Sequence, residues 1–150
     1  MEPIKLSTLW IILHRLQQNG CTYKLGAKAP AVMCDTSQVH SIDCSGFVRF
    51  AIAKATDGKV IFPDGSFTQH DFCKAQGLHV VDYNNAVNPE FNKGRLFIAF
   101  EDPNPVGHVW LINEGHTLES SGHVGPNSRD ANTPMFHSIC SGCYELICVP

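Results

Sequence analysis

One cysteine stands where the sequence predicts the start of a helix. Asp43, Cys44, Ser45 and Gly46 precede an apolar stretch that runs to Ala55. We expect a buried helix that begins at or near Cys44, with Asp43 as its N-cap. A thiol there lies against the positive end of the helix dipole, which favours the nucleophilic thiolate, and the Cys44 N–H would be an oxyanion donor. The alternative is an inert, buried helix cysteine.

A histidine begins an otherwise apolar strand in the last third of the chain. His108 follows Gly107 and, by alternation, shares a strand face with Trp110 and Ile112. In a two-layered domain one face of this strand must meet the Cys44 helix. His108 is therefore a candidate to take the thiol proton, as in cysteine hydrolases. A core histidine bonded to a backbone carbonyl is the alternative.

A third polar residue would hold the imidazole in one tautomer, and the next strand offers three candidates. Glu119, Ser121 and His123 lie on or just after the strand predicted to pair with the His108 strand. Glu119 and Ser121 share a face, so alternation does not separate them. We take Glu119 as the prediction and keep Ser121 and His123 as alternatives. A solvated strand edge is the competing interpretation for each.

Composition limits what kind of protein can carry these residues. The chain has 150 residues, 43% of them apolar and 17% charged, and a net charge of −3, which fits one globular domain spanning 1–150. It has no basic excess to bind nucleic acid. The apolar run 9–13 is too short to cross a membrane, and no secretory signal precedes it. We therefore expect a domain that binds neither nucleic acid nor membrane.

The periodicity predicts helices first and antiparallel strands afterwards, which is typical of an α+β fold. The expected helices cover 4–18, the segment from Cys44 to 55, and 68–76. The expected strands cover 78–81, 95–100, 106–113, 116–120 and 144–149, with loops at 21–42, 102–105 and 122–134.

These motifs resemble those of a known family. Asp43 to Val48, followed by Gly107-His108-Val109 about 60 residues later, is similar to the motif pair of the NlpC/P60 cysteine peptidases. The stretches 23–26, 62–69 and 117–125 resemble further segments of the family in order and spacing, and the last is closest to phage-tail and related cell-wall lysis proteins. The resemblance covers roughly residues 6–130. It implies a papain-like fold with the cysteine helix packed on a small antiparallel sheet.

The resemblance also implies roles for individual residues. Cys44 matches the nucleophile and His108 the general base. Asp43 and Ser45 match positions that contact the free amine of a stem-peptide substrate, and Tyr23 matches a tyrosine near the oxyanion. In the family the third polar residue is commonly a histidine, where this chain offers Glu119 and its neighbours. The implied activity is hydrolysis of amide bonds in bacterial peptidoglycan stem peptides, for example between D-Glu and a diamino acid, without a cofactor.

The same resemblance sets expectations about partners and delivery. The enzyme would act as a monomer in the periplasm or cell wall. Because the chain carries no signal peptide, a phage or a contact-dependent secretion system would deliver it. Delivery as a secreted, bacteriolytic effector would imply a protein immunity inhibitor that blocks the active-site groove.

The tail holds a rival site. His137, Cys140, Cys143 and Cys148 offer four potential zinc ligands within twelve residues, although the second half lacks the Cys-x2-Cys spacing. We favour inert thiols or disulfides over metal, and the seven cysteines leave the pairing open. Two other functions therefore stay open: a thiol acyltransferase or deamidase on the same scaffold, and a non-catalytic module held by a tail zinc.

Overall fold

A computed structural model describes residues 1–102 and 106–150 of the chain. The loop predicted at 102–105 lies mostly outside the described residues. The elements in chain order are β1 (Ile4–Lys5), α1 (Leu6–Gln18), the 3-10 helix Thr36–Gln38, α2 (Cys44–Ala55), α3 (Ser66–Ala75), α4 (Tyr83–Ala86), β2 (Leu96–Glu101), β3 (His108–Asn113), β4 (His116–Ser121), β5 (Gly125–Asn127), α5 (Pro134–Ile139), β6 (Gly142–Leu146) and β7 (Cys148–Val149).

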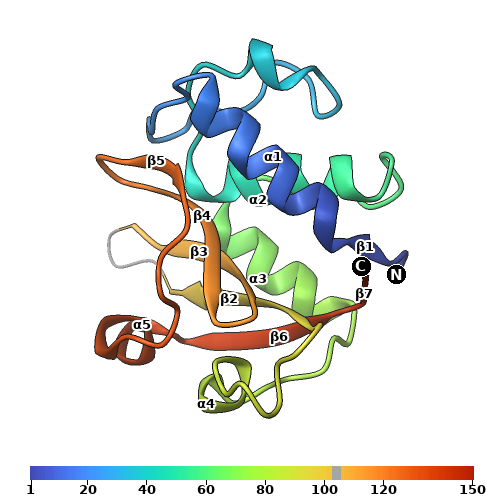
Figure 1. Cartoon of the computed structure of the whole chain (residues 1–150), viewed down its shortest axis with the longest axis vertical. Helices are drawn as coiled ribbons and strands as arrows, with labels where there is room; N and C mark the ends of the chain where they lie inside the picture. Colours follow the sequence, from blue (N-terminus) through green and yellow to red (C-terminus); the bar gives the residue numbers. More distant parts are fainter. Residues whose placement is uncertain (103–105) are drawn as a thin grey trace.

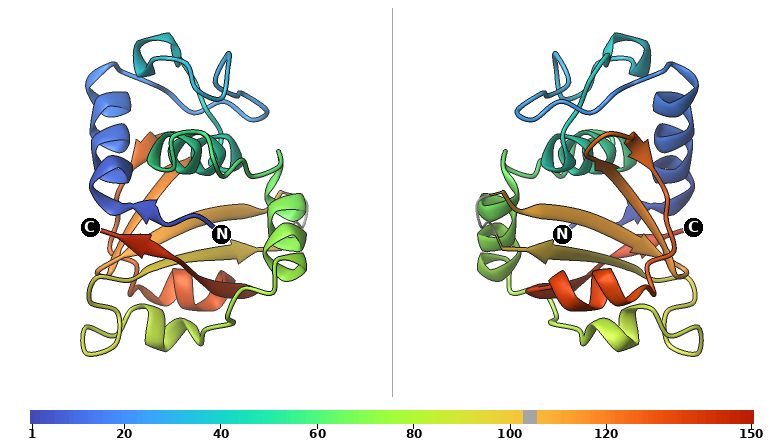
Figure 2. Two further views of the ribbon diagram at one scale, coloured as in Figure 1. Left: turned by 90° about the vertical axis from the view of Figure 1, so that its right-hand side faces the viewer. Right: turned by 90° about the vertical axis from the view of Figure 1, so that its left-hand side faces the viewer.

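Five of the described strands form one antiparallel sheet in the order β5-β4-β3-β2-β6. Helices α1 and α2 lie on one face of this sheet, and the short helices α4 and α5 lie on the other (Figure 1, Figure 2). The third helix, α3, stands at one side of the sheet in both views of Figure 2. The protein thus has the α+β architecture that the element order predicts, with the helix from Cys44 packed on a small antiparallel sheet as the resemblance implies.

The side chains on the two faces of the sheet belong to two separate apolar cores, because successive side chains of a strand point to opposite faces. On β2, Ile98 and Phe100 join the core beneath α1 and α2, whereas Phe97 and Ala99 join the core beneath α4 and α5. On β3, Trp110 belongs to the second core. The strand is buried on both faces, which explains why its sequence is apolar almost throughout.

The first and last segments of the chain meet beside the main sheet. Ile4 and Lys5 pair in parallel with Cys148 and Val149, so the two ends of the chain lie close together (Figure 1). The helix predicted from residue 4 therefore begins at Leu6. The strand predicted over 144–149 is divided between two sheets.

Three other expectations are corrected by the structure. The segment 78–81 forms only a bridge, Val80 to Tyr144, along the edge of β6. The predicted loop 122–134 contains β5, which pairs with β4 through residues such as Glu119 and Asn127. Helix α5 was not predicted, although Thr133 before Pro134 is an N-cap followed by proline at the first helical position. In the described part of the chain, no helix combines the length and apolarity needed to cross a membrane.

Candidate active site

Helix α2 begins at Cys44, as the sequence predicts. Asp43 has extended backbone dihedrals, and its carboxylate accepts a hydrogen bond from the Gly46 N–H at 2.7 Å. This N-cap removes one of the unpaired donors of the first turn. The Cys44 side chain is 7% exposed. The thiol therefore lies at the N-terminus of a buried helix, beside the positive end of its dipole.

Gly46 is required by the close approach of the preceding loop. A Cβ atom at this position would lie 2.8 Å from Asp43 Oδ1 and 2.9 Å from the Ala27 carbonyl oxygen. The Asp43 N–H donates to the same carbonyl at 3.0 Å. Only glycine leaves room for the capping carboxylate and the loop together.

His108 is the first residue of β3 and reaches the site from the opposite strand face to the one that contacts α2. Its ring stacks on Trp110 with centroids 5.5 Å apart, whereas Val109 and Leu111 pack in the core shared with α2. Alternation alone would therefore place His108 away from Cys44.

Cys44 and His108 come together where the pairing between β3 and β4 ends. The register of β3 with β4 extends only as far as Leu111 opposite Leu118. His108 and Glu119 lie beyond this paired part, where the Ser120 hydroxyl instead donates to the Ile42 carbonyl just before α2, at 2.8 Å. The N-terminus of α2 thus approaches the sheet where the two strands are no longer paired.

Charges on both sides of the ring favour the imidazolium form of His108. Its Nε2 lies 2.8 Å from Glu119 Oε1. Burial alone would lower the pKa of His108, but hydrogen bonds to the Cys44 sulfur and the Glu119 carboxylate, together with their charges, raise the pKa to about 9. The structure thus places an imidazole that favours its protonated form between the Cys44 sulfur and the Glu119 carboxylate.

Glu119 is completely buried and is held by several donors. Arg129 Nη2 lies 2.6 Å from Oε1 and Arg129 Nε 3.0 Å from Oε2, while the Thr117 hydroxyl also donates to Oε2. Burial raises the pKa of Glu119, but the hydrogen bonds from His108, Arg129 and Thr117 outweigh it and hold the pKa below its usual value. Glu119 is therefore a carboxylate despite its burial.

The structure separates the three candidates for the third residue. Ser121 accepts a hydrogen bond from Asn127 Nδ2 at 2.7 Å, and His123 occupies an exposed turn with a φ of 70°. Of the three, Glu119 is the one that hydrogen-bonds His108. Sequence reasoning missed Arg129, although it is the only lysine or arginine in the segment 122–134.

The residues that flank Cys44 are bound within the chain. Lys28 Nζ lies 2.9 Å from both carboxylate oxygens of Asp43 and 3.1 Å from Ser45 Oγ. Asp43 and Ser45 are both buried, with exposed fractions of 5% and 3%. Burial first, then the nearby charges of Cys44 and Asp43, raises the pKa of Tyr23. Tyr23 therefore lies close to Cys44 and Asp43.

All seven cysteines lie in the described residues and are free thiols. Burial raises the pKa of Cys21 to about 11 and that of Cys73 to about 12, and it also raises the pKa of Cys143. These three thiols are poor nucleophiles at neutral pH. The sequence left the pairing of the cysteines open, and the structure joins none of them.

The tail residues considered as zinc ligands have separate partners. His137 Nε2 contacts Asn132, the Cys140 thiol donates to the Gly142 carbonyl, and the Cys148 thiol donates to the Gly94 carbonyl. Within residues 1–102 and 106–150, no group of three or more His, Cys, Asp or Glu side chains is arranged to hold a metal.

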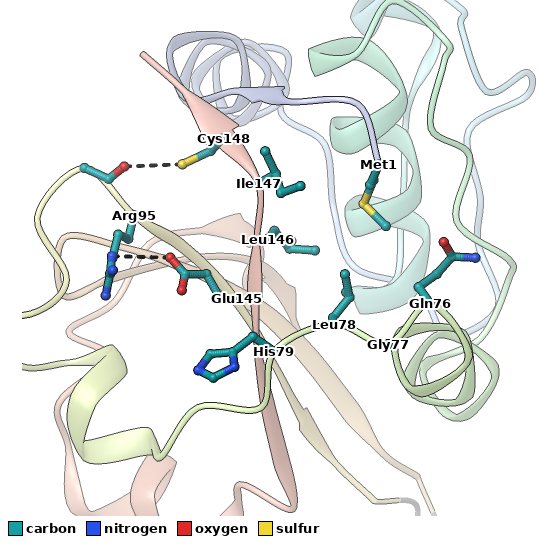
Figure 3. A pocket seen from close by; sticks show the side chains of 11 residues that line it. Met1, Gln76, Gly77, Leu78, His79, Arg95, Glu145, Leu146, Ile147 and Cys148 are labelled. Atoms are coloured by element: carbon teal, nitrogen blue, oxygen red, sulfur yellow. Dashed lines mark hydrogen bonds and ion pairs between the residues drawn. The ribbon is translucent and has the colours of Figure 1, made fainter.

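A cavity of about 490 Å³ lies elsewhere, between the end of α3 and the strands β6 and β7 (Figure 3). Apolar side chains such as Leu78 and Ile147 line it beside the Arg95–Glu145 ion pair, in which Nε and Oε2 are 3.3 Å apart. None of its lining residues belongs to the Cys44 site. The cavity therefore does not extend the candidate active site.

Comparisons with known proteins agree with the fold. No family model and no curated protein matches the sequence. Among solved structures, an NLP/P60 family protein similar to a lipoprotein, from Staphylococcus aureus, matches over 97% of this chain and 43% of its own, with 18% identity and a TM-score of 0.61. This chain thus spans less than half of that protein. The P60 domain of an antigen from M. avium subspecies paratuberculosis matches over 96% of this chain and 97% of its own, with 18% identity and a TM-score of 0.54. The chain has an NlpC/P60-type fold.

Proposed function

We propose that the protein is a cysteine hydrolase that cleaves amide bonds in bacterial peptidoglycan stem peptides. The observation that carries the proposal is the position of His108, between the thiol at the N-terminus of α2 and the buried carboxylate of Glu119. The NlpC/P60-type fold and the sequence resemblance support the choice of a cell-wall peptide as substrate.

The reaction follows from the charges at the site. The Cys44 thiolate attacks the scissile carbonyl carbon, and the Cys44 N–H, with Tyr23 nearby, stabilises the oxyanion. The imidazolium of His108 then gives its proton to the leaving amine, and the acyl-enzyme forms. Water gives a proton to the neutral imidazole and attacks the thioester. Collapse of the tetrahedral intermediate releases the acid product and restores the Cys44 thiolate and the His108 imidazolium.

Glu119 and Arg129 act behind the imidazole. Glu119 fixes the ring through Nε2, so that the other ring nitrogen faces the thiol. Arg129 keeps Glu119 ionised during the proton transfers. With the thiolate, the imidazolium, the carboxylate and the guanidinium all charged, the four groups sum to zero. The resting ion pair therefore does not leave a net charge in the buried part of the site.

The test is digestion of purified muropeptides by the wild-type protein and by Cys44→Ala and His108→Ala, with reductant, followed by mass spectrometry. We expect only the wild type to produce fragments, with one water added per bond cleaved. Cys73→Ala is the matched control, because it removes a buried thiol outside the site. Fragments from Cys44→Ala, or no fragments from a folded wild type, would contradict the proposal. Transfer of the acyl group to an added amine would indicate an acyltransferase instead.

A further inference from the structure

The carboxylate of Asp43 has no capacity left for a substrate. Oδ1 accepts from Lys28 Nζ, from the Gly46 N–H and from the Ser45 hydroxyl, the last at 3.3 Å. Oδ2 accepts from Lys28 Nζ and from the Gly26 N–H at 3.1 Å. A carboxylate offers about four lone-pair positions, so these five contacts fill it. Asp43 is an anchor for the loop and the helix.

The donors of the Lys28 ammonium are likewise all paired. An ammonium has three N–H donors, and Lys28 finds three acceptors in the two Asp43 oxygens and Ser45 Oγ, all within 3.1 Å. The Lys28 side chain remains 29% exposed, whereas that of Asp43 is 8% exposed. The ion pair is therefore reached from solvent through Lys28.

A carboxylate and a hydroxyl on either side of a nucleophile would otherwise bind an ammonium group of a substrate. In this chain the ammonium is supplied by Lys28. A substrate amine would have to displace the lysine from three hydrogen bonds, and it would meet a positive charge on the way. A substrate whose amine is acylated carries no such charge and competes for none of these bonds.

We propose that Lys28 is a specificity-determining residue that closes the Asp43–Ser45 site to free amines. It directs the enzyme to stem peptides whose terminal nitrogen is acylated, as it is where the peptide is still attached to the glycan. This inference rests on the proposed function and narrows its substrate class. It also replaces the substrate-binding role that the sequence resemblance implied for Asp43 and Ser45.

The experiment compares two peptides that differ at one nitrogen: a stem tetrapeptide with a free terminal amine and its N-acetyl form. Binding to the uncleaving Cys44→Ala protein is measured by calorimetry, and cleavage by the wild type is measured in parallel. We expect the acetylated peptide to bind more tightly and to be cleaved faster. In the Cys44→Ala background, Lys28→Met should move the preference toward the free amine by about tenfold or more, because it frees the two Asp43 oxygens and Ser45.

Two variants control for effects of charge and folding. Lys24→Met removes an exposed lysine from the same loop and should leave the preference unchanged. Lys28→Arg keeps the positive charge and should keep the preference for the acetylated peptide. If Lys28→Met does not fold, Lys28→Gln gives the same comparison with a neutral side chain that can still donate to Asp43.

Three results would overturn the inference. The first is tighter binding of the free amine to the protein that retains Lys28. The second is an unchanged preference in a folded Lys28→Met or Lys28→Gln protein. The third is failure of the wild type to cleave either peptide or intact muropeptides, which removes the proposed function as well. The first two leave cleavage intact, so they reject only the role of Lys28.

Discussion

Arg129 and Glu119 form a two-point ion pair on the far side of the imidazole from the nucleophile. Arg129 Nη2 lies 2.6 Å from Oε1, the same oxygen that lies 2.8 Å from His108 Nε2. One carboxylate oxygen thus joins a guanidinium to the imidazole. In the proposed mechanism Arg129 is a positioning residue that acts through Glu119, although it lies far from Cys44 in the sequence.

Replacing Glu119 should be far more damaging than replacing its neighbours. Glu119→Gln keeps the size of the side chain but removes the charge that favours the imidazolium and fixes its orientation. We expect kcat/KM on muropeptides to fall by roughly 100- to 10,000-fold. Ser121→Ala and His123→Ala should retain activity near that of the wild type, because the hydrogen bond to His108 comes from Glu119, whereas Ser121 bonds Asn127 and His123 lies in an exposed turn. Comparable losses in all three variants would refute the assignment.

Removing Arg129 should shift the pH dependence as well as the rate. Arg129→Met withdraws two donors from Glu119, so the pKa of Glu119 should rise. As the pH falls, activity should then be lost at a higher pH than in the wild type, and the free energy of unfolding should decrease by about 1–3 kcal/mol. Arg95→Met breaks an ion pair outside the site and should leave the pH profile unchanged. Identical profiles for all three proteins would indicate a purely structural role for Arg129.

The raised pKa of His108 predicts a basic limit of activity. The imidazolium is the acid that protonates the leaving amine, and its pKa is about 9, so the rate should fall as the pH rises through about 9. Because Glu119 raises this pKa, Glu119→Gln should move the basic limb to lower pH. A wild-type limb near the ordinary histidine value of about 6.5 would contradict the ion pair.

The same pKa links His108 to stability. A folded-state pKa above the unfolded value of about 6.5 stabilises the protein fully below that pH, and this contribution is lost as the pH rises through about 9. The free energy of unfolding measured in urea should therefore be lower at pH 10 than at pH 6 in the wild type. This decrease should be smaller in His108→Asn. An equal decrease in both proteins would show that groups other than His108 cause it.

Gly46→Ala should disturb the start of α2. The added methyl group would lie 2.8 Å from Asp43 Oδ1 and 2.9 Å from the Ala27 carbonyl oxygen, so either the cap or the loop must move. We expect a destabilisation of about 1–3 kcal/mol and a loss of activity, measured by urea unfolding and muropeptide cleavage. Gly122→Ala is the matched control, because nothing lies within 4 Å of its Cβ position. If Gly46→Ala were as stable and active as the control, the close packing of this loop would contribute to neither stability nor activity.

Local signals were sufficient to predict much of the fold. An N-cap aspartate before an apolar helical stretch predicts α2 beginning at Cys44, and the structure has that helix. The strand expected over 116–120 is predicted to pair with the His108 strand, and β4 pairs with β3 in the structure. These elements are specified by residues a few positions apart. By contrast, the two-residue strand β1 pairs with β7 only because the ends of the chain meet, so no local pattern predicts β1 or the separation of β7 from β6.

Sequence alone indicated Cys44, His108 and Glu119 as a possible set, because the helix cap and the polar residues on two neighbouring predicted strands are visible in the order of residue types. Strand alternation, however, places His108 on the face opposite to the one that packs against α2. It left Glu119 and Ser121 equivalent, since both lie on one strand face. Only the tertiary structure placed Glu119 against His108 and brought Arg129 to the same carboxylate. It also brought Lys28, fifteen residues before Asp43, onto the oxygens beside the nucleophile. Such contacts join separate loops and strands, and their partners are decided by how the chain packs, which spacing along the sequence does not encode.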